Sequence, residues 1–264
     1  MMKITRTFVL GLCAISVFAC KTAEPASLTI VQYNVGVFDK YAESGVGAIA
    51  SAVREMGADV VTLNELDSCT VRTGGVYQLA AFAQEMGEWN HHYASAMPYD
   101  GGAYGVGVAS KPEYVVVRTD KIALPKIDGR EPRAVAVVEF EDFVVCSTHL
   151  DLTEQSQLAQ VAAINEYMDS HFADCKKPIF LGGDFNCMPG SQPIEVMKQS
   201  WDLLTPEDET YPAYAPKKSI DFIFVRPNGK SVIVESTSVP VNLESADLAT
   251  ASDHLPVVLT VKIK

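Results

Sequence analysis

Apolar, β-branched runs recur along this chain, and several of them end on a polar side chain. Residues 28–34 alternate in the manner of a strand and end on an amide. Residues 59–65 repeat the pattern and end on an acid, and residues 177–180 lead through two glycines to Asp184. We expect those glycines to turn the backbone sharply after the strand. Such a chain is typical of a sheet protein whose strand ends carry chemistry.

The spacing of apolar residues predicts the remaining elements. Helical spacing predicts helices at residues 44–57, 75–87, 154–172 and 193–199. Further strands are predicted at residues 91–96, 104–110, 114–119, 134–140, 143–150, 219–225, 231–239 and 255–263. Strands dominate and the helices fall into two groups. The expected fold class is therefore a mixed α/β protein, with two sheets packed face to face and helices on the outer faces.

The first residues are typical of an export signal. Two basic residues precede the apolar residues 8–19, a stretch that is too short to span a membrane. The stretch ends at Cys20 in a sequence that resembles a bacterial lipobox, so we expect cleavage before Cys20 and lipid attachment to its thiol. Residues 20–27 would form a tether and residues 28–264 a single domain. The alternatives are a protein anchored in the periplasm or at the cell surface, and a secreted protein with a plain signal peptide.

Charge and cysteine content limit the function classes. The net charge is −12, and loss of residues 1–19, with two basic residues and no acid, would bring it to −14. An acidic surface repels phosphate backbones at long range, which argues against a high-affinity nucleic-acid binder. The remaining cysteines do not have the spacing of a zinc cluster, and their disulfide pairing stays open: Cys69, Cys146, Cys175 and Cys187.

The polar residues at the strand ends form a set that catalysis can use. Residues two apart in an extended segment share a side, so Asp184 and Asn186 would face one small substrate. Asp221 lies within an apolar strand, where a charge must be paired or metal-bound. The other members are Asn34, Glu65, His149, Asp253 and His254. Carboxylates, amides and histidines without clustered thiols favour Mg²⁺, Mn²⁺ or Ca²⁺ over zinc.

Six short motifs are similar, in this order, to those of the endonuclease/exonuclease/phosphatase superfamily. They are YNVG from Tyr33, NELD from Asn64, STHLD from Ser147, GDFN from Gly183, IDFIF from Ile220 and SDHLP from Ser252. The set spans nearly all of the chain after the export signal. The resemblance implies a four-layered α/β sandwich, two mixed β-sheets flanked by helices. It also implies metal-dependent hydrolysis of phosphate esters, usually with Mg²⁺.

The resemblance further implies a role for each of these residues. Glu65 resembles the carboxylate that binds the metal, and Asn34 resembles its amide partner. His254 resembles the catalytic base, held in its tautomer by Asp253. The position two residues after Asn34 carries an acid in some members of the superfamily, and Gly36 there removes any metal contact from it, which argues against a second metal.

The other implied roles concern water and phosphate. Asp184 would orient the attacking water or take its proton. Asn186 and His149 would hold the non-bridging phosphate oxygens as negative charge develops. Asp221 would support His149 or the metal.

Three more residues are expected to contact substrate. Arg72 resembles a basic position in close relatives and would fork onto a phosphate, or it is an exposed loop arginine. Tyr104 would line the pocket or serve in packing. Arg133 would contact a phosphate or form a structural ion pair. Lys217 and Lys218 are expected as a solvated pair near the pocket rim.

These expectations converge on an exported monomer that hydrolyses phosphate mono- or diesters. Its substrate would be a phosphorylated small molecule or a lipid headgroup. A secreted DNase-like endonuclease is the alternative within the superfamily, because acidic secreted nucleases of this type exist. A non-catalytic surface binding protein on the same scaffold is the alternative from another class, since a fold does not dictate a function.

Overall fold

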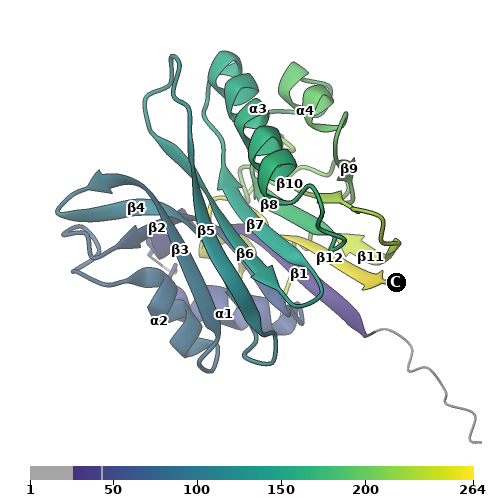
Figure 1. Cartoon of the computed structure of the whole chain (residues 1–264). Helices are drawn as coiled ribbons and strands as arrows, with labels where there is room; N and C mark the ends of the chain where they lie inside the picture. The colour runs from purple at the N-terminus through teal and green to yellow at the C-terminus, as the bar shows by residue number, and fades with distance from the viewer. Residues whose placement is uncertain (1–25, 43) are drawn as a thin grey trace, which may run out of the picture.

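The computed structural model describes residues 26–42 and 44–264, and two six-stranded sheets form its centre (Figure 1). The predicted export signal and Cys20 lie outside the described residues. Among the residues that the structure describes, no helix combines the length and the apolar character needed to cross a membrane.

The first sheet has the strand order β11-β12-β1-β2-β4-β3. Its strands are β1 (Ser27–Asn34), β2 (Val60–Ser68), β3 (Asn90–Tyr99), β4 (Gly102–Ser110), β11 (Val232–Ser238) and β12 (Val257–Ile263). Its outer face packs against α1 (Val46–Glu55), α2 (Gln78–Glu85), the short 3₁₀ helix η1 (Gly36–Phe38) and α5 (Leu248–Ala251).

The second sheet has the strand order β5-β6-β7-β8-β10-β9. Its strands are β5 (Val116–Leu124), β6 (Arg133–Phe140), β7 (Val144–His149), β8 (Ile179–Asp184), β9 (Asp202–Leu203) and β10 (Asp221–Arg226). The long helix α3 (Glu154–His171) and the short α4 (Gln192–Met197) cover its outer face.

Three apolar layers hold these elements together. One layer lies between the first sheet and α1 and α2, and a second lies between the second sheet and α3 and α4. The third joins the two sheets, with Ile30 and Val60 from one and Phe180 and Ile223 from the other. Helices, sheet, sheet and helices thus form four layers, which confirms the expected sandwich.

Each sheet contains one parallel pair of strands joined through a helix. In the first sheet, β1 is parallel to β2, and in the second, β7 is parallel to β8. In both sheets these pairs are flanked by antiparallel strands. Parallel strands end on the same side of a sheet. Asn34 and Asn64 are therefore in register at the strand ends of the first sheet, and His149 and Asp184 are in register at the strand ends of the second. These strand ends of the two sheets meet, and the site forms there.

The two glycines before Asp184 do not turn the chain, contrary to the sequence-based expectation. They continue β8, where a Cβ atom on Gly182 would lie 2.3 Å from Oγ1 of Thr62 in the other sheet. A Cβ atom on Gly183 would lie 2.3 Å from the backbone oxygen of Thr148 in β7. The glycines therefore allow close packing within and between the sheets, and Asp184 ends the strand itself.

Several element boundaries also differ from the predicted ones. The helix expected from residue 75 begins at Gln78, because Gly74 and Gly75 both have positive φ angles, 67° and 76°. Strand β5 begins at Val116 and continues to Leu124, beyond the predicted 114–119. The chain between Trp201 and Pro216 is mostly loop and includes the short β9.

Candidate active site

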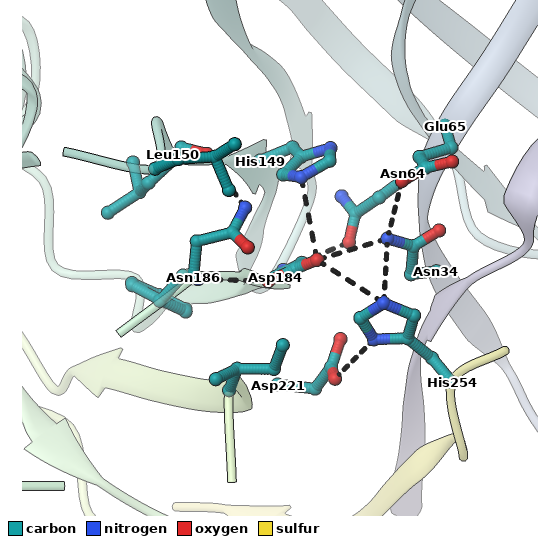
Figure 2. A network of polar contacts seen from close by, with 12 residues as sticks. Asn34, Asn64, Glu65, His149, Leu150, Asp184, Asn186, Asp221 and His254 are labelled. Atoms are coloured by element: carbon teal, nitrogen blue, oxygen red, sulfur yellow. Dashed lines mark hydrogen bonds and ion pairs between the residues drawn. The ribbon is translucent and has the colours of Figure 1, made fainter. Parts of the chain in front are cut away.

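Asp184 is the centre of a buried polar network (Figure 2). Its Oδ2 atom accepts a hydrogen bond from Nδ2 of Asn34 at 3.0 Å and lies 3.4 Å from Nε2 of His149. Nε2 of His254 is 3.7 Å from the same oxygen, and Oδ1 accepts from the backbone N–H of Asn186 at 2.9 Å. Burial and the charge of Asp221 raise the pKa of Asp184 to about 7. A carboxyl group with a pKa near neutrality is suited to proton transfer.

The imidazole of His254 is oriented by Asp221. Nδ1 of His254 lies 2.8 Å from Oδ2 of Asp221, which leaves Nε2 directed toward Asp184 and the pocket. Asp221 is itself fixed, because Thr210 donates to its Oδ2 at 2.6 Å and Gln32 to its Oδ1 at 3.3 Å. Burial opposes the charge on His254, but the charges of Asp221 and Asp184 outweigh it and raise the pKa of His254 to about 10.

This contact corrects two expectations from the sequence. Asp253 does not hold the tautomer of His254, because its carboxylate instead pairs with Nζ of Lys40 at 2.7 Å. Asp221 contacts His254 and not His149, which leaves support of a metal as the other role expected for it. The physical reason is the fold: β10 places Asp221 opposite Asp184, within reach of a histidine that follows α5.

His149 is held by Arg133. Nη1 of Arg133 lies 3.2 Å from Nδ1 of His149, and both side chains are buried. A guanidinium group only donates, so Nδ1 must accept and Nε2 carries the hydrogen that points at Asp184. Burial, followed by the charge of Arg133, holds the pKa of His149 well below its usual range. His149 is therefore a neutral hydrogen-bond donor at the floor of the site.

A β-bulge brings Glu65 into the site. In the pairing of β2 with β4, Leu63 is opposite Gly107 and Leu66 is opposite Gly105, so two residues of β2 face one of β4. Glu65 has a positive φ angle of 57° there, and its carboxylate accepts a hydrogen bond from Asn34 at 3.2 Å. The bulge explains why β2 continues to Ser68, three residues beyond the predicted strand end.

Asn64 ties the two sheets together beneath the site, a role that the sequence analysis missed. Its Oδ1 accepts from the backbone N–H of Asp184 at 3.0 Å, and its Nδ2 donates to the backbone oxygen of Thr148 at 2.7 Å. Gln32 donates to the same Oδ1 at 2.5 Å. Both are polar residues at fully buried positions of predicted strands, which is the signal that could have identified them.

Two sets of side chains offer metal-binding atoms. One atom each from Asp184, Asp221 and His254 lies within 4.8 Å of the other two, close enough to hold an ion. The contacts described above already engage these atoms with one another. Glu65, by contrast, has Asn34 as its single hydrogen-bond partner among the described residues. Both sets consist of hard donors that suit divalent metals.

These residues line a pocket of about 680 Å³. Of the expected site residues, those that reach it are Glu65, Arg72, Tyr104, Arg133, His149, Asp184, Asn186, Asp253 and His254. Asn34 and Asp221 lie behind it, fully buried, and act through Asp184 and His254. Lys218 also lines the pocket, whereas its neighbour Lys217 does not.

Arg72 forms one wall of the pocket in a fixed position. Its Nε and Nη2 donate to the two carboxylate oxygens of the buried Asp67, at 2.6 and 2.7 Å. Its guanidinium carbon lies 4.4 Å from the ring centre of Tyr99 and 5.8 Å from that of Tyr104. The Nε and Nη2 groups, which were expected to bind a phosphate, are thus engaged by Asp67. Nη1 is the remaining nitrogen of the guanidinium group.

Lys40 is a further pocket residue that the sequence did not indicate. Burial alone would lower the pKa of Lys40, but the hydrogen bond to Asp253 and the charges of Asp253 and Glu65 raise it.

Asn186 reaches the pocket through a positive φ angle of 51°, and its Nδ2 donates to the backbone oxygen of Leu150 at 3.1 Å. The cysteines of the described residues, Cys69, Cys146, Cys175 and Cys187, are all free thiols.

Known structures share this fold. An endonuclease/exonuclease/phosphatase family protein from Bacteroides thetaiotaomicron aligns with a TM-score of 0.74 and 19% identity, over 91% of this chain and 98% of that one. A mannosyl-6-phosphatase of Bacteroides thetaiotaomicron aligns with a TM-score of 0.71 and 18% identity, over 90% and 99%. The human Nocturnin catalytic domain with bound sulfate aligns with a TM-score of 0.69 and 16% identity, over 91% and 94%.

At the level of sequence, no curated protein gives a significant match to this chain. The profile of the Endonuclease/Exonuclease/phosphatase family, however, matches residues 31–254. The matched range includes every expected site residue, from Asn34 to His254. This chain therefore belongs to the endonuclease/exonuclease/phosphatase family.

Proposed function

We propose that this protein is an exported, divalent-metal-dependent phosphatase that acts on a small phosphorylated molecule. One observation carries the proposal: Asp184, His149 and the His254–Asp221 pair converge on the floor of a single pocket. Family membership makes hydrolysis of a phosphate ester the expected chemistry. An intact set of proton-transfer groups argues against the non-catalytic binding protein.

Glu65 would hold the metal, with Asn34 fixing its carboxylate, as in the resemblance described above. The orientation of Glu65 toward the pocket and its hard oxygen donors suit Mg²⁺, or Mn²⁺ or Ca²⁺. When bound, such an ion neutralises the charge of the phosphate ester and assists the departure of the leaving oxygen.

The residues of this chain would share the remaining work. Asp184 would accept a proton from the attacking water, in keeping with its raised pKa. His254, kept protonated by Asp221, would donate a hydrogen bond to a phosphate oxygen in place of acting as the base that the resemblance implies. Neutral His149 would hold Asp184 in position through its Nε2–H. Asn186 reaches the same pocket and would contribute a second polar contact to the phosphate.

The pocket favours a compact substrate over a nucleic acid. Its volume of about 680 Å³ is in the range of small-molecule sites. Lys40, Arg72 and Lys218 supply positive charge at this pocket, although the chain as a whole carries a net charge of −12. The structural neighbour that is a mannosyl-6-phosphatase makes hexose phosphates the first substrates to test.

The position of the pocket also favours a substrate from the aqueous phase over a lipid headgroup. Ser27 begins β1 and Asn34 ends it, so the site lies at the far end of an eight-residue strand, about 23 Å away. A protein anchored through Cys20 would hold the membrane near Ser27 and the pocket away from it.

Incorporation of labelled palmitate, lost in Cys20→Ser, would test the anchor. An unlabelled parent protein would favour the secreted alternative.

The experiment that tests the activity compares four kinds of substrate with Mg²⁺ or Mn²⁺ present. They are an aryl phosphomonoester, an aryl phosphodiester, hexose phosphates such as mannose 6-phosphate, and supercoiled plasmid at low salt. We expect turnover of the monoesters and no nicking. His254→Ala and Asp184→Ala should each reduce the rate by about 10³-fold or more, whereas His171→Ala, an exposed histidine on α3, should not. Plasmid nicking that depends on His254 would make the protein a nuclease instead.

A further inference from the structure

Lys40 occupies a corner of the pocket beside the carboxylate of Asp253. Its Nζ atom lies 2.7 Å from Oδ2 of Asp253, and its side chain is 40% exposed while that of Asp253 is 10% exposed. The carboxylate of Glu65 lies near enough to favour the charged amine. The ammonium therefore neutralises Asp253 directly and is also favoured by the charge of Glu65.

The space for Lys40 exists because position 36 is a glycine. A Cβ atom on Gly36 would lie 3.2 Å from Cβ and 3.3 Å from Cδ of Lys40, and 3.4 Å from Oδ1 of Asp253. A larger side chain there would press on both. The stem of Lys40 thus fills the space that a side chain at position 36 would need.

The backbone that returns Lys40 to the pocket is strained. Gly36, Val37 and Phe38 have φ angles of 51°, 52° and 53°, and positive φ is costly for a β-branched or aromatic residue. The turn is fixed from outside, because Phe38 stacks on Phe82 with ring centres 6.1 Å apart and Gln78 donates to the backbone oxygen of Val37. Strain of this kind persists where the surroundings determine it, which marks the placement of Lys40 as a built feature.

Asp253 has one oxygen left for another partner. Its Oδ1 is buried and has no hydrogen-bond partner among the described residues, while Oδ2 is taken by Lys40. A buried carboxylate oxygen without a partner is costly, so a water, a substrate hydroxyl or the single metal is expected to complete it. A second divalent ion in this corner would have to compete with the ammonium for Asp253, and Gly36 offers it no ligand.

We infer that Lys40 is a built-in cation of the pocket, which takes the place of a second divalent ion so that the site binds one metal per chain. This inference rests on the proposed metal site at Glu65. An ammonium group has three N–H donors, and the one held by Asp253 leaves two for the substrate phosphate. Lys40 thus contributes positive charge that does not depend on the metal concentration.

Mn²⁺ binding to the purified protein tests this directly, with free Mn²⁺ measured by electron paramagnetic resonance. We expect one bound Mn²⁺ per chain in the unaltered protein and in Lys40→Arg, which keeps the charge. Lys40→Met and Lys40→Gln should bind two, because the vacated corner leaves both carboxylate oxygens of Asp253 without a partner. Lys217→Met, the removal of a lysine that does not line the pocket, should still bind one.

Two results would overturn the inference: two Mn²⁺ ions in the unaltered protein, or one in both Lys40→Met and Lys40→Gln. The measurement needs no turnover, so it separates this inference from the proposed activity. A change from one ion to two, in a protein that hydrolyses no ester, would support the role of Lys40 while the proposed activity failed. Hydrolysis by the unaltered protein, together with one bound Mn²⁺ in both Lys40→Met and Lys40→Gln, would reject the role of Lys40 and leave the proposed activity standing.

Discussion

Nδ1 of His254 lies 2.8 Å from Oδ2 of Asp221, a residue 33 positions earlier in the chain. The adjacent Asp253 pairs with Lys40 instead. The two acids near His254 therefore have different roles. Asp221 sets the orientation and charge of the imidazole, and Asp253 forms an ion pair with Lys40. A sequence motif places Asp253 next to His254, but only the antiparallel pairing of β10 with β8 brings Asp221 to the histidine.

Asp221→Asn should reduce kcat/KM on an aryl phosphate by about 10³- to 10⁴-fold, because an amide can support the wrong tautomer of His254 and no longer favours its charge. Asp253→Asn should cost less, and it should shift the alkaline limb to lower pH by less than Asp221→Asn does, because Asp253 contributes the smaller part of the charge that raises the pKa of His254. Steady-state kinetics across pH distinguishes the two variants. An equal loss in both, with identical pH profiles, would show that Asp221 has no special relation to His254.

The rate should pass through a maximum between neutral and alkaline pH. The active form needs Asp184 deprotonated, so the rate rises as pH passes the Asp184 pKa of about 7. It also needs His254 protonated, so the rate falls as pH passes the His254 pKa of about 10. A cation bound at Glu65 favours the basic forms and moves both limbs to lower pH. A rate that only falls from pH 5 upward would contradict these assignments.

Much of this site could be predicted from sequence, because strand ends are marked by local pattern. The apolar runs before Asn34, Glu65, His149 and Asp184 locate the strands, and the four layers follow from their number and the helices between them. What could not be predicted depends on long-range packing. The bulge at Glu65 appears only when β2 pairs with β4.

The same limit applies to individual contacts. Lys40 follows a turn whose positive φ angles are fixed by α2, and nothing in its local sequence indicates the pocket. Arg72 was expected to bind phosphate with its fork, but the buried Asp67 takes that edge at 2.6 and 2.7 Å. Partners of charged side chains are set by the tertiary structure, and their sequence spacing says little about them.

Arg133 should prove to be a positioning residue. Replacing it with Met removes the donor to Nδ1 of His149, so the neutral imidazole can move its hydrogen from Nε2 to Nδ1 and lose its contact with Asp184. We expect a fall in kcat of about 10- to 100-fold. The ¹⁵N chemical shifts of His149 report the tautomer directly. Arg133→Lys should retain part of the rate. If the Met variant keeps the Nε2–H tautomer and loses activity, Arg133 instead contacts the substrate.

Glu65 should account for the response of the protein to metal. EDTA should abolish hydrolysis, and Mn²⁺ at about 100 times its dissociation constant should stabilise the fold by roughly 2.7 kcal/mol, or about 5 to 10 °C in Tm. Glu65→Gln should lose most of that gain because the amide is a neutral ligand. Differential scanning fluorimetry measures it without substrate. Glu131→Gln alters another glutamate of the pocket and should keep the gain. An unchanged gain in Glu65→Gln would favour the Asp184, Asp221 and His254 cluster as the metal site.

Gly183→Ala should damage both stability and activity, because the added Cβ would lie 2.3 Å from the backbone oxygen of Thr148. Backbone cannot move aside cheaply, so we expect a loss of about 2–4 kcal/mol in the free energy of unfolding. Thr148 and Gly183 directly precede His149 and Asp184, and the two strands are paired in register. Pushing β7 from β8 therefore separates the two side chains, and kcat should fall even where the variant is fully folded.

Gly47→Ala in α1, where a Cβ meets nothing within 4 Å, should instead stabilise by about 0.5–1 kcal/mol. Urea unfolding and kinetics at 15 °C measure both effects, and a Gly183→Ala protein as active as its parent would mean that the strand pair tolerates more separation than its packing implies.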